Sequence, residues 1–227
     1  MSNSYASVEN RAIQSEGTSA DAIYGMVGEV LRTRGCRGGC LLDVGCGRGR
    51  LRAHLVNLFD RYAGADVVRY DDFLADAEFY RIDLDSGRIP LDDGAVDAVV
   101  AVETIEHLEN PRAFARELTR LCKPGGVIVV TTPNQLSFLS KLSLMIKNRF
   151  PAFSDSNYPA HLTALLEVDL RRIAAECGWR DVQINYTCRG RIPGTKLHWP
   201  TILPRMLPRA FSDNFCVAGI APSIQAK

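Results

Sequence analysis

Two short apolar runs constrain the fold of this 227-residue chain more than any other feature. Residues 95–102 read AVDAVVAV and residues 127–131 read VIVVT; the first is rich in Val and Ala and the second in Val and Ile, and neither alternates with polar residues. Amphipathic helices are predicted nearby, among them 20–34 and 167–177. Strands that are apolar on both faces and alternate with helices are typical of a parallel sheet covered on both sides. The sequence therefore predicts an α/β fold.

The remaining elements continue this alternation. Asn110 and Pro111 are predicted to begin a helix that ends at Lys123, and another helix is expected after Gly49. Five further strands are predicted, at 40–44, 62–66, 79–82, 181–187 and 215–220. We expect a mobile N-terminal segment at 1–18 and one domain over 19–227, with insertions at about 135–160 and 189–211.

Composition narrows the function classes. Hydrophobic residues make up 46% of the chain, which suffices for a core and argues against a disordered protein. The 27 basic and 26 acidic side chains nearly cancel, so net charge gives no case for a nucleic-acid partner. No segment approaches the roughly 20 apolar residues of a spanning helix. Seven scattered cysteines suit free thiols in a reducing compartment, and we expect a cytoplasmic protein.

A glycine-rich loop follows the first predicted strand, where residues 42–49 read LDVGCGRG. Glycines there let the backbone approach a ligand closely and present its N–H groups. Asp66 ends the second predicted strand, where a carboxylate can bind the two hydroxyls of a ribose. A dinucleotide fingerprint would need glycine in place of Arg50, and it would bring a pyrophosphate close to Asp43. Asp43 suits a cofactor with a cationic amino-acid end, such as S-adenosylmethionine, so a nicotinamide dehydrogenase is disfavoured.

These motifs resemble those of class I S-adenosylmethionine-dependent methyltransferases. The similar segments are LDVGCGRG at 42–49, GAD at 64–66, RIDLDSGRIPLDDGAVDAVVAVETIEHL at 81–108 and LCKPGGVIVVTTPN at 121–134. The resemblance implies a Rossmann-like, doubly wound, seven-stranded sheet, mostly parallel with a reversed last strand, and S-adenosylmethionine as cofactor. It implies that the methionine end of the cofactor contacts Asp43, Gly45, Cys46, Gly47 and Gly49. The ribose would contact Asp66, and the adenine would contact Asp83 and Leu84. Val102 and Glu103 are further expected cofactor-binding residues.

Glu103, Glu106 and His107 follow the fourth predicted strand, in the sequence ETIEH. Ligands of open α/β sheets bind outside the carboxyl ends of the strands, so these three are the candidate catalytic residues. His107 can act as a general base that takes a proton from a substrate hydroxyl. Alternatively, all three can bind a divalent metal with His161 as a fourth ligand. A third interpretation is that both glutamates only orient loops or contact the cofactor.

The stretch around ETIEH, with TTPN at 131–134, resembles ubiquinone-biosynthesis O-methyltransferases and their bacterial relatives. That resemblance implies O-methylation of a small-molecule, sugar or lipid-linked acceptor. We favour this function, with no metal ion at the catalytic residues. The stretch is also similar to small-RNA 3′-terminal 2′-O-methyltransferases, in which Glu-x-x-Glu-His and a later histidine bind magnesium or manganese. The region around His161 lacks the aromatic-rich motif of that family. A cofactor-binding protein without turnover is the alternative from another class.

Two basic segments are expected to surround the acceptor. Residues 138–150 can form a basic amphipathic helix. Residues 189–211 carry five basic residues, no acidic residue and four prolines, so we expect an irregular insertion rather than a helix. We predict that it lies between two antiparallel edge strands and selects the acceptor. Basic residues interleaved with large apolar ones suit either a substrate lid or peripheral contact with an anionic membrane. The oligomeric state stays open.

Overall fold

The computed structural model describes residues 9–10, 12–13, 15, 17–85 and 87–223. Residues 1–8 of the segment predicted to be mobile lie outside this description, so its mobility stays a prediction. No helix among the described residues has the length and apolar character needed to span a bilayer.

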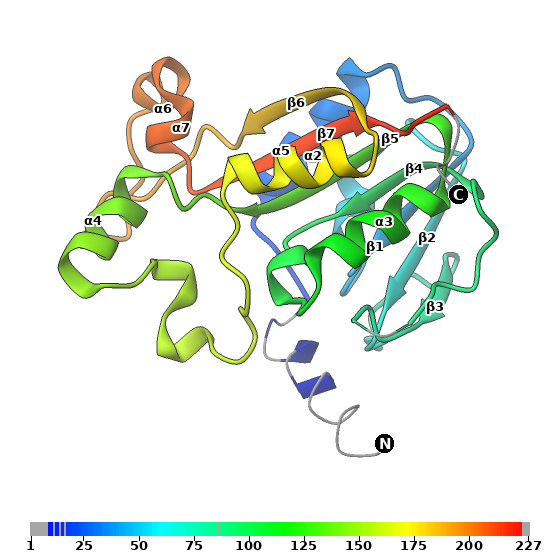
Figure 1. The fold of residues 1–227 in the computed structure, drawn as a ribbon, viewed down its shortest axis with the longest axis horizontal. Helices are drawn as coiled ribbons and strands as arrows, with labels where there is room; N and C mark the ends of the chain where they lie inside the picture. Colours follow the sequence, from blue (N-terminus) through cyan, green and yellow to red (C-terminus); the bar gives the residue numbers. More distant parts are fainter. Residues whose placement is uncertain (1–8, 11, 14, 16, 86, 224–227) are drawn as a thin grey trace.

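The described residues form one seven-stranded sheet in the order β3-β2-β1-β4-β5-β7-β6 (Figure 1). The strands are β1 (Cys40–Val44), β2 (Arg61–Asp66), β3 (Glu78–Arg81), β4 (Val96–Ala101), β5 (Cys122–Pro133), β6 (Arg180–Tyr186) and β7 (Asn214–Ile220). Strands β1 to β5 pair in parallel, whereas β7 is antiparallel to both β5 and β6. The predicted doubly wound sheet with a reversed last strand is confirmed, as is the antiparallel pairing of the two strands that flank 189–211.

The direction of winding reverses between β1 and β4. The chain passes from β1 outwards through β2 to β3, and then returns to place β4 on the other side of β1. At such a switch point the loops after the two central strands diverge and leave a crevice at their carboxyl ends. The glycine loop follows β1 and the sequence ETIEH follows β4, so this topology brings both motifs to one crevice.

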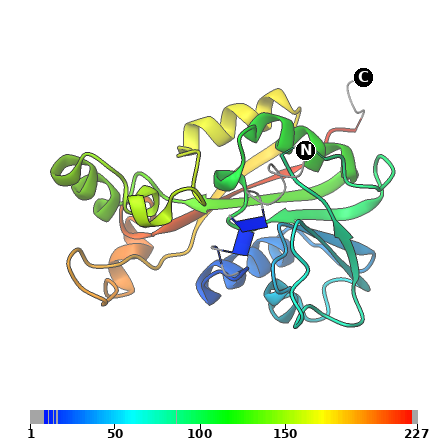
Figure 2. The same cartoon turned by 90° about the horizontal axis from the view of Figure 1, so that it is seen from below.

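Helices cover both faces of the sheet. Figure 2 shows α3 (Pro111–Leu121) and α5 (Glu167–Glu176) on one face and α2 (Asp21–Thr33) on the other. Because alternate side chains of a strand point to opposite faces, Leu42 joins Leu118 in one core while Leu41 joins Leu31 in the other. Further helices among the described residues include α4 (Phe138–Lys147), α6 (Ile202–Met206), α7 (Pro208–Phe211) and the short 3₁₀ helices η1 (Arg50–His54), η2 (Ile105–His107), η3 (Pro151–Phe153) and η4 (Asp155–Asn157).

Two predicted elements differ from the structure. The helix expected after Gly49 is only the 3₁₀ helix η1, which ends at His54; Asn57, whose left-handed φ of 62° does not fit a continuing helix, lies in the turn that leads to β2. The segment 189–211, expected to be irregular, contains the short helices α6 and α7. They stay separate because Pro208, which has no N–H to donate, follows α6 and begins α7. The predicted N-cap of α3 is confirmed, since the Asn110 side chain accepts a hydrogen bond from the Ala113 N–H.

Candidate active site

A cavity of about 270 Å³ lies at the crevice between β1 and β4. Its floor is the glycine loop, in which Gly45 has a left-handed φ of 75°. A Cβ at Gly45 would lie 2.2 Å from Thr104 Oγ1, so only glycine fits there. Of the predicted cofactor residues, eight line this cavity: Asp43, Gly45, Cys46, Gly47, Asp66, Leu84, Val102 and Glu103.

Asp43 presents an unpartnered oxygen beside this cavity. The carboxylate is 2% exposed, and its Oδ2 accepts a hydrogen bond of 2.5 Å from the Tyr62 hydroxyl. Its Oδ1 is buried and has no hydrogen-bond partner among the described residues. Burial raises the pKa of the carboxyl to about 7, although the Tyr62 hydrogen bond opposes that rise. A buried acceptor without a donor costs about 1–3 kcal/mol. The site therefore fits a ligand with a positively charged donor, such as the ammonium group of S-adenosylmethionine.

Asp66 lies at the end of β2, where the ribose contact is expected. It is 9% exposed, and its carboxylate accepts hydrogen bonds from the N–H groups of Gly47 (2.8 Å) and Val68 (3.3 Å). Burial raises the pKa of this carboxyl, while those backbone donors lower it. The carboxylate thus ties the glycine loop to β2 and still borders the cavity.

The two remaining predicted cofactor residues lie outside the lining. Asp83 is 4% exposed, and its Oδ1 accepts the Asp85 N–H at 3.0 Å. Gly49 stands where the loop enters η1, with a φ of 72°. Asp85 borders the cavity and was not predicted, although it follows Asp83 by two positions.

Residues before α2 close the cavity on the side of the glycine loop. The Gly17 carbonyl accepts a hydrogen bond of 3.0 Å from the Arg48 N–H, and a Cβ at Gly47 would lie 2.2 Å from that carbonyl oxygen. Ala12, Ser15, Gly17, Thr18 and Ser19 also line the cavity. Of these, Ala12, Ser15, Gly17 and Thr18 belong to the 1–18 segment, so described residues of that segment are part of the pocket wall, which no local sequence pattern indicated.

Glu103 stands immediately after β4 in a conformation unusual for a side chain with a Cβ. Its φ is 50°, in the left-handed region, where strain of about 1–3 kcal/mol is typical. The carboxylate accepts hydrogen bonds from Thr131 Oγ1 (3.1 Å) and from Asn214 Nδ2 (2.7 Å). Burial raises the pKa of Glu103 to about 7 despite these two donors. Both of its oxygens are thus directed to neighbouring strands.

Glu106, His107 and His161 come together although His161 is distant in sequence. The ligand atoms of the three side chains all lie within 4.8 Å of one another. Glu106 is fully buried; its Oε2 accepts a hydrogen bond of 3.2 Å from Thr132 Oγ1, and its Oε1 has no partner among the described residues. Burial raises the pKa of Glu106 well above its ordinary value. The structure thus brings together three of the four candidate metal ligands, and Glu103 is not in this group.

The two histidines have defined roles for their ring nitrogens. His107 Nδ1 lies 2.7 Å from the Ala160 carbonyl oxygen, so Nδ1 donates and Nε2 is the basic atom of the ring. The His161 ring packs edge-on against His107 with centroids 4.6 Å apart. His161 Nδ1 is buried without a partner among the described residues. Burial, and secondly the neighbouring His107, lower the pKa of His161 to about 4, which keeps this ring neutral at physiological pH.

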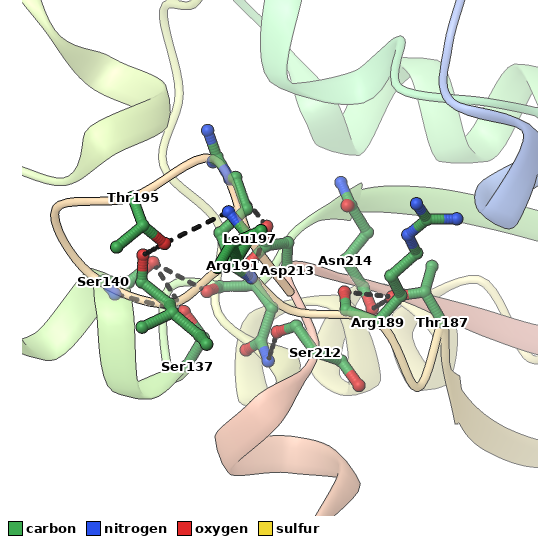
Figure 3. Close-up of polar contacts among 12 residues, drawn as sticks. Ser137, Ser140, Thr187, Arg189, Arg191, Thr195, Leu197, Ser212, Asp213 and Asn214 are labelled. Atoms are coloured by element: carbon green, nitrogen blue, oxygen red, sulfur yellow. Dashed lines mark hydrogen bonds and ion pairs between the residues drawn. The ribbon is translucent and has the colours of Figure 1, made fainter. Parts of the chain in front are cut away.

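A second cavity of about 610 Å³ adjoins the first and shares Ala20, Glu103 and His161 with it. Its wall includes Leu139 and Ser140 of α4, and Arg189, Arg191 and His198 of the 189–211 insertion. Arg191 is held by an ion pair of 2.8 Å with Asp213, whereas the Arg189 side chain extends to the same side as Asn214 (Figure 3). Both segments predicted to surround the acceptor therefore line a cavity next to the first one.

Comparisons with known proteins agree with this architecture. The methyltransferase domain family matches residues 22–184. A probable S-adenosylmethionine-dependent methyltransferase of Mycolicibacterium smegmatis is 35% identical over 106 residues, covering 45% of this chain and 41% of that protein. The ubiquinone biosynthesis O-methyltransferase of Maricaulis maris is 30% identical over 130 residues, covering 54% and 50%. The chain thus spans half or less of the length of these relatives.

One similar solved structure is the 1,6-didemethyltoxoflavin-N1-methyltransferase of Burkholderia thailandensis, with its substrate and S-adenosylhomocysteine bound. It superposes with a TM-score of 0.58 at 14% identity, over 89% of this chain and 80% of that chain. At this identity the likeness shows the fold alone.

Proposed function

Since the chain belongs to the methyltransferase domain family and is a class I S-adenosylmethionine-dependent methyltransferase, we propose that it methylates a hydroxyl oxygen of a small-molecule, sugar or lipid-linked acceptor. The observation that carries this proposal is the pair of adjoining cavities, which meet at Glu103 and His161. In this proposal the first cavity holds the cofactor and the acceptor enters from the second, where its oxygen would approach the methyl group in line with the breaking carbon–sulfur bond.

The cofactor cavity supplies complementary groups for the whole cofactor. When bound, S-adenosylmethionine supplies a methyl group already activated on a sulfonium. Asp43 Oδ1, which has no donor among the described residues, would accept a hydrogen bond from the ammonium group. Asp66 would bind the ribose hydroxyls, and Leu84, with Asp85 beside it in the cavity wall, would contact the adenine. The glycine loop keeps the backbone close to the methionine end.

His107 is the proposed general base. Its Nδ1 donates to the Ala160 carbonyl, so Nε2 is the ring nitrogen that carries the lone pair able to take the acceptor's proton. In the reaction, the acceptor oxygen forms a bond to the methyl carbon and the carbon–sulfur bond breaks. The hydroxyl proton passes to His107, and S-adenosylhomocysteine is released. Such a base matters most for a weakly acidic hydroxyl.

A turnover screen tests this function. Release of S-adenosylhomocysteine is followed with hydroxylated metabolites, glycans and RNA, each with and without EDTA. His107→Ala should lower turnover by about 10²–10⁴-fold. The binding constant of S-adenosylhomocysteine for the same variant is the control and should change less than tenfold. Near-normal turnover by His107→Ala would exclude the base, and no turnover with any acceptor would favour a cofactor-binding protein.

A second candidate function is metal-dependent 2′-O-methylation of an RNA 3′ end. It is favoured by two buried atoms without partners among the described residues, Glu106 Oε1 and His161 Nδ1, and by the approach of the Glu106, His107 and His161 ligand atoms to within 4.8 Å of one another. His107 also donates its other ring nitrogen to a backbone carbonyl, as metal-binding histidines usually do. A divalent cation there would lower the pKa of an acceptor hydroxyl.

Direct metal binding separates the two candidates. Titration of the purified protein with Mn²⁺, followed by calorimetry, should show one site if the second candidate holds. Glu106→Gln should abolish that site, and Glu103→Gln is the matched control, because the Glu103 oxygens bind Thr131 and Asn214 instead. Absence of Mn²⁺ binding together with full activity in EDTA would exclude the metal.

A further inference from the structure

Large apolar side chains are exposed mainly at one end of the molecule. Of the twelve that are exposed among the described residues, eight lie on α4 or between 197 and 207: Phe138, Leu144, Met145, Ile146, Leu197, Ile202, Met206 and Leu207. Figures 1 and 2 both show α4 beside α6 and α7 at the same end, and α4 contacts α7. These eight residues are called the apolar end surface below. Monomeric proteins rarely leave so many apolar side chains together without a partner.

An aromatic cluster holds the two halves of this surface together. The centroid of the Phe138 ring on α4 lies 6.1 Å from that of the Trp199 ring and 6.4 Å from that of the Phe211 ring. Trp199 and Phe211 also pack edge-on against each other at 5.1 Å. The aromatic cluster therefore packs α4 against the 189–211 insertion, and the exposed apolar side chains lie on these two packed segments.

The two segments that carry the apolar end surface are basic. The segments 138–150 and 189–211 carry eight basic and no acidic residues, in a chain whose net charge is only +1. Arg149, Arg191 and Arg209 form ion pairs with Asp155, Asp213 and Glu167. The other five form no ion pair among the described residues: Lys141, Lys147, Arg189, Lys196 and Arg205.

We propose that the apolar end surface docks on the interface of a bilayer that contains anionic lipids. Exposed apolar side chains flanked by Lys and Arg suit such an interface, because the former enter the boundary of the acyl chains while the latter attract anionic headgroups. A second copy of this chain fits less well, since it would bring like charges together around the contact. The proposal thus commits to a lipid surface as the occupant.

The docking surface adjoins the second cavity. That cavity is lined by Leu139 and Ser140 of α4 and by His198 of the insertion, the two segments that carry the apolar end surface. An acceptor with a lipid tail could therefore reach the cavity while its tail stays in the bilayer. This last step rests on the proposed function, whereas docking itself does not.

Vesicle flotation with the full chain tests the docking. The vesicles are phosphatidylcholine alone or phosphatidylcholine with about one third phosphatidylglycerol, so that the anionic headgroup is the only difference. We expect binding to the anionic vesicles only, weakening at least about tenfold when salt rises from about 0.1 M to about 0.5 M. No binding to anionic vesicles, or equal binding to both kinds, would overturn the proposal.

Charged substitutions locate the contact. Met145 is 78% exposed and Met206 71%, so Met145→Glu and Met206→Glu should leave the fold intact and each weaken vesicle binding at least about tenfold. Val56→Glu is the matched control, because Val56 is 67% exposed but lies outside the two segments. Equal losses in all three variants would overturn the assignment. So would a wild-type dimer in size-exclusion chromatography that Met145→Glu converts to monomer, since a second copy would then cover the surface.

The docking proposal and the proposed O-methyltransferase function can be refuted independently of each other. Vesicle binding needs no cofactor or acceptor, so it survives if the chain transfers no methyl group to oxygen. Conversely, turnover of a water-soluble acceptor by Met145→Glu at the wild-type rate, with vesicle binding lost, supports docking as a function distinct from catalysis.

Discussion

Asp43 should make the unfolding free energy of the cofactor-free protein depend on pH. Burial gives its carboxyl a pKa of about 7 in the fold against an ordinary value of 3.8. Between these values the folded state holds a proton that the unfolded state has released, so the unfolding free energy falls as the pH rises. Each unit of difference between the two pKa values corresponds to about 1.4 kcal/mol. At a pH above the folded-state pKa, the ionised Asp43 carboxyl therefore lowers the unfolding free energy by about 4 kcal/mol.

Asp43→Asn removes this titration while keeping the size of the side chain and an acceptor for the Tyr62 hydroxyl. Between about pH 5.5 and about pH 8, linkage gives a loss of about 2 kcal/mol from the Asp43 carboxyl alone. Other buried carboxyls titrate in both proteins, so the difference between wild type and variant isolates Asp43. Urea unfolding of both cofactor-free proteins across this pH range measures it. Parallel pH profiles of the two proteins would refute the reasoning.

The same carboxyl should link cofactor binding to proton release. The cofactor's ammonium favours the ionised carboxylate, so binding below about pH 7, where an α-amino group stays charged, should release protons. Calorimetry of S-adenosylhomocysteine binding in two buffers of different ionisation enthalpy counts these protons. Wild type should show release that Asp43→Asn lacks. Equal proton release by both proteins would place the ammonium elsewhere.

Three further outcomes are expected. Asp66→Ala should weaken S-adenosylhomocysteine binding by about 1–3 kcal/mol, measured by calorimetry, because it leaves the ribose hydroxyls and the Gly47 N–H without an acceptor. Gly45→Ala should lower the melting temperature and abolish detectable cofactor binding, since its φ of 75° and the 2.2 Å approach to Thr104 exclude a Cβ; an unchanged melting temperature would contradict this. Replacement of 192–208 by a short Gly-Ser link should keep S-adenosylhomocysteine affinity within about tenfold, yet abolish methylation of the true acceptor in the turnover assay. Normal methylation would show that the insertion does not select the acceptor.

The sequence predicted the sheet well because its central strands are buried on both faces. Apolar strands such as 95–102 must be covered on both faces. Their number and their alternation with helices are therefore compatible with few arrangements of the sheet. The missing helix after Gly49 shows the limit of this approach. Leu51, Leu55 and Leu58 have helical spacing and are all buried as expected. The helix nevertheless ends at His54, and the chain turns at Asn57 towards β2. Left-handed residues of this kind leave no pattern that a single sequence reveals.

The site was predictable where one motif supplies the residues and unpredictable where distant segments meet. Asp43 is the penultimate residue of β1 and Asp66 the last of the adjacent β2, so topology alone brings them to one cavity. The residues at 12–19 reach the same cavity through a backbone contact from Gly17 to Arg48, which no periodicity encodes. The separation of Glu103 from Glu106 likewise depends on Asn214 and Thr131 attracting its carboxylate.

The position of β7 bears on how the chain is synthesised. It is the last of the seven strands of this sheet in chain order, yet it lies inside the sheet between β5 and β6, with Phe215 to Ala218 at most 1% exposed. Until residues 214–220 emerge, the outer edge of β5 has unpaired N–H and C=O groups, which can pair with another nascent chain. A message truncated between residues 162 and 213 would encode all the residues that line the first cavity and still release a sheet with an open edge at β5. The nascent chain is therefore exposed to aggregation through this edge until β7 emerges.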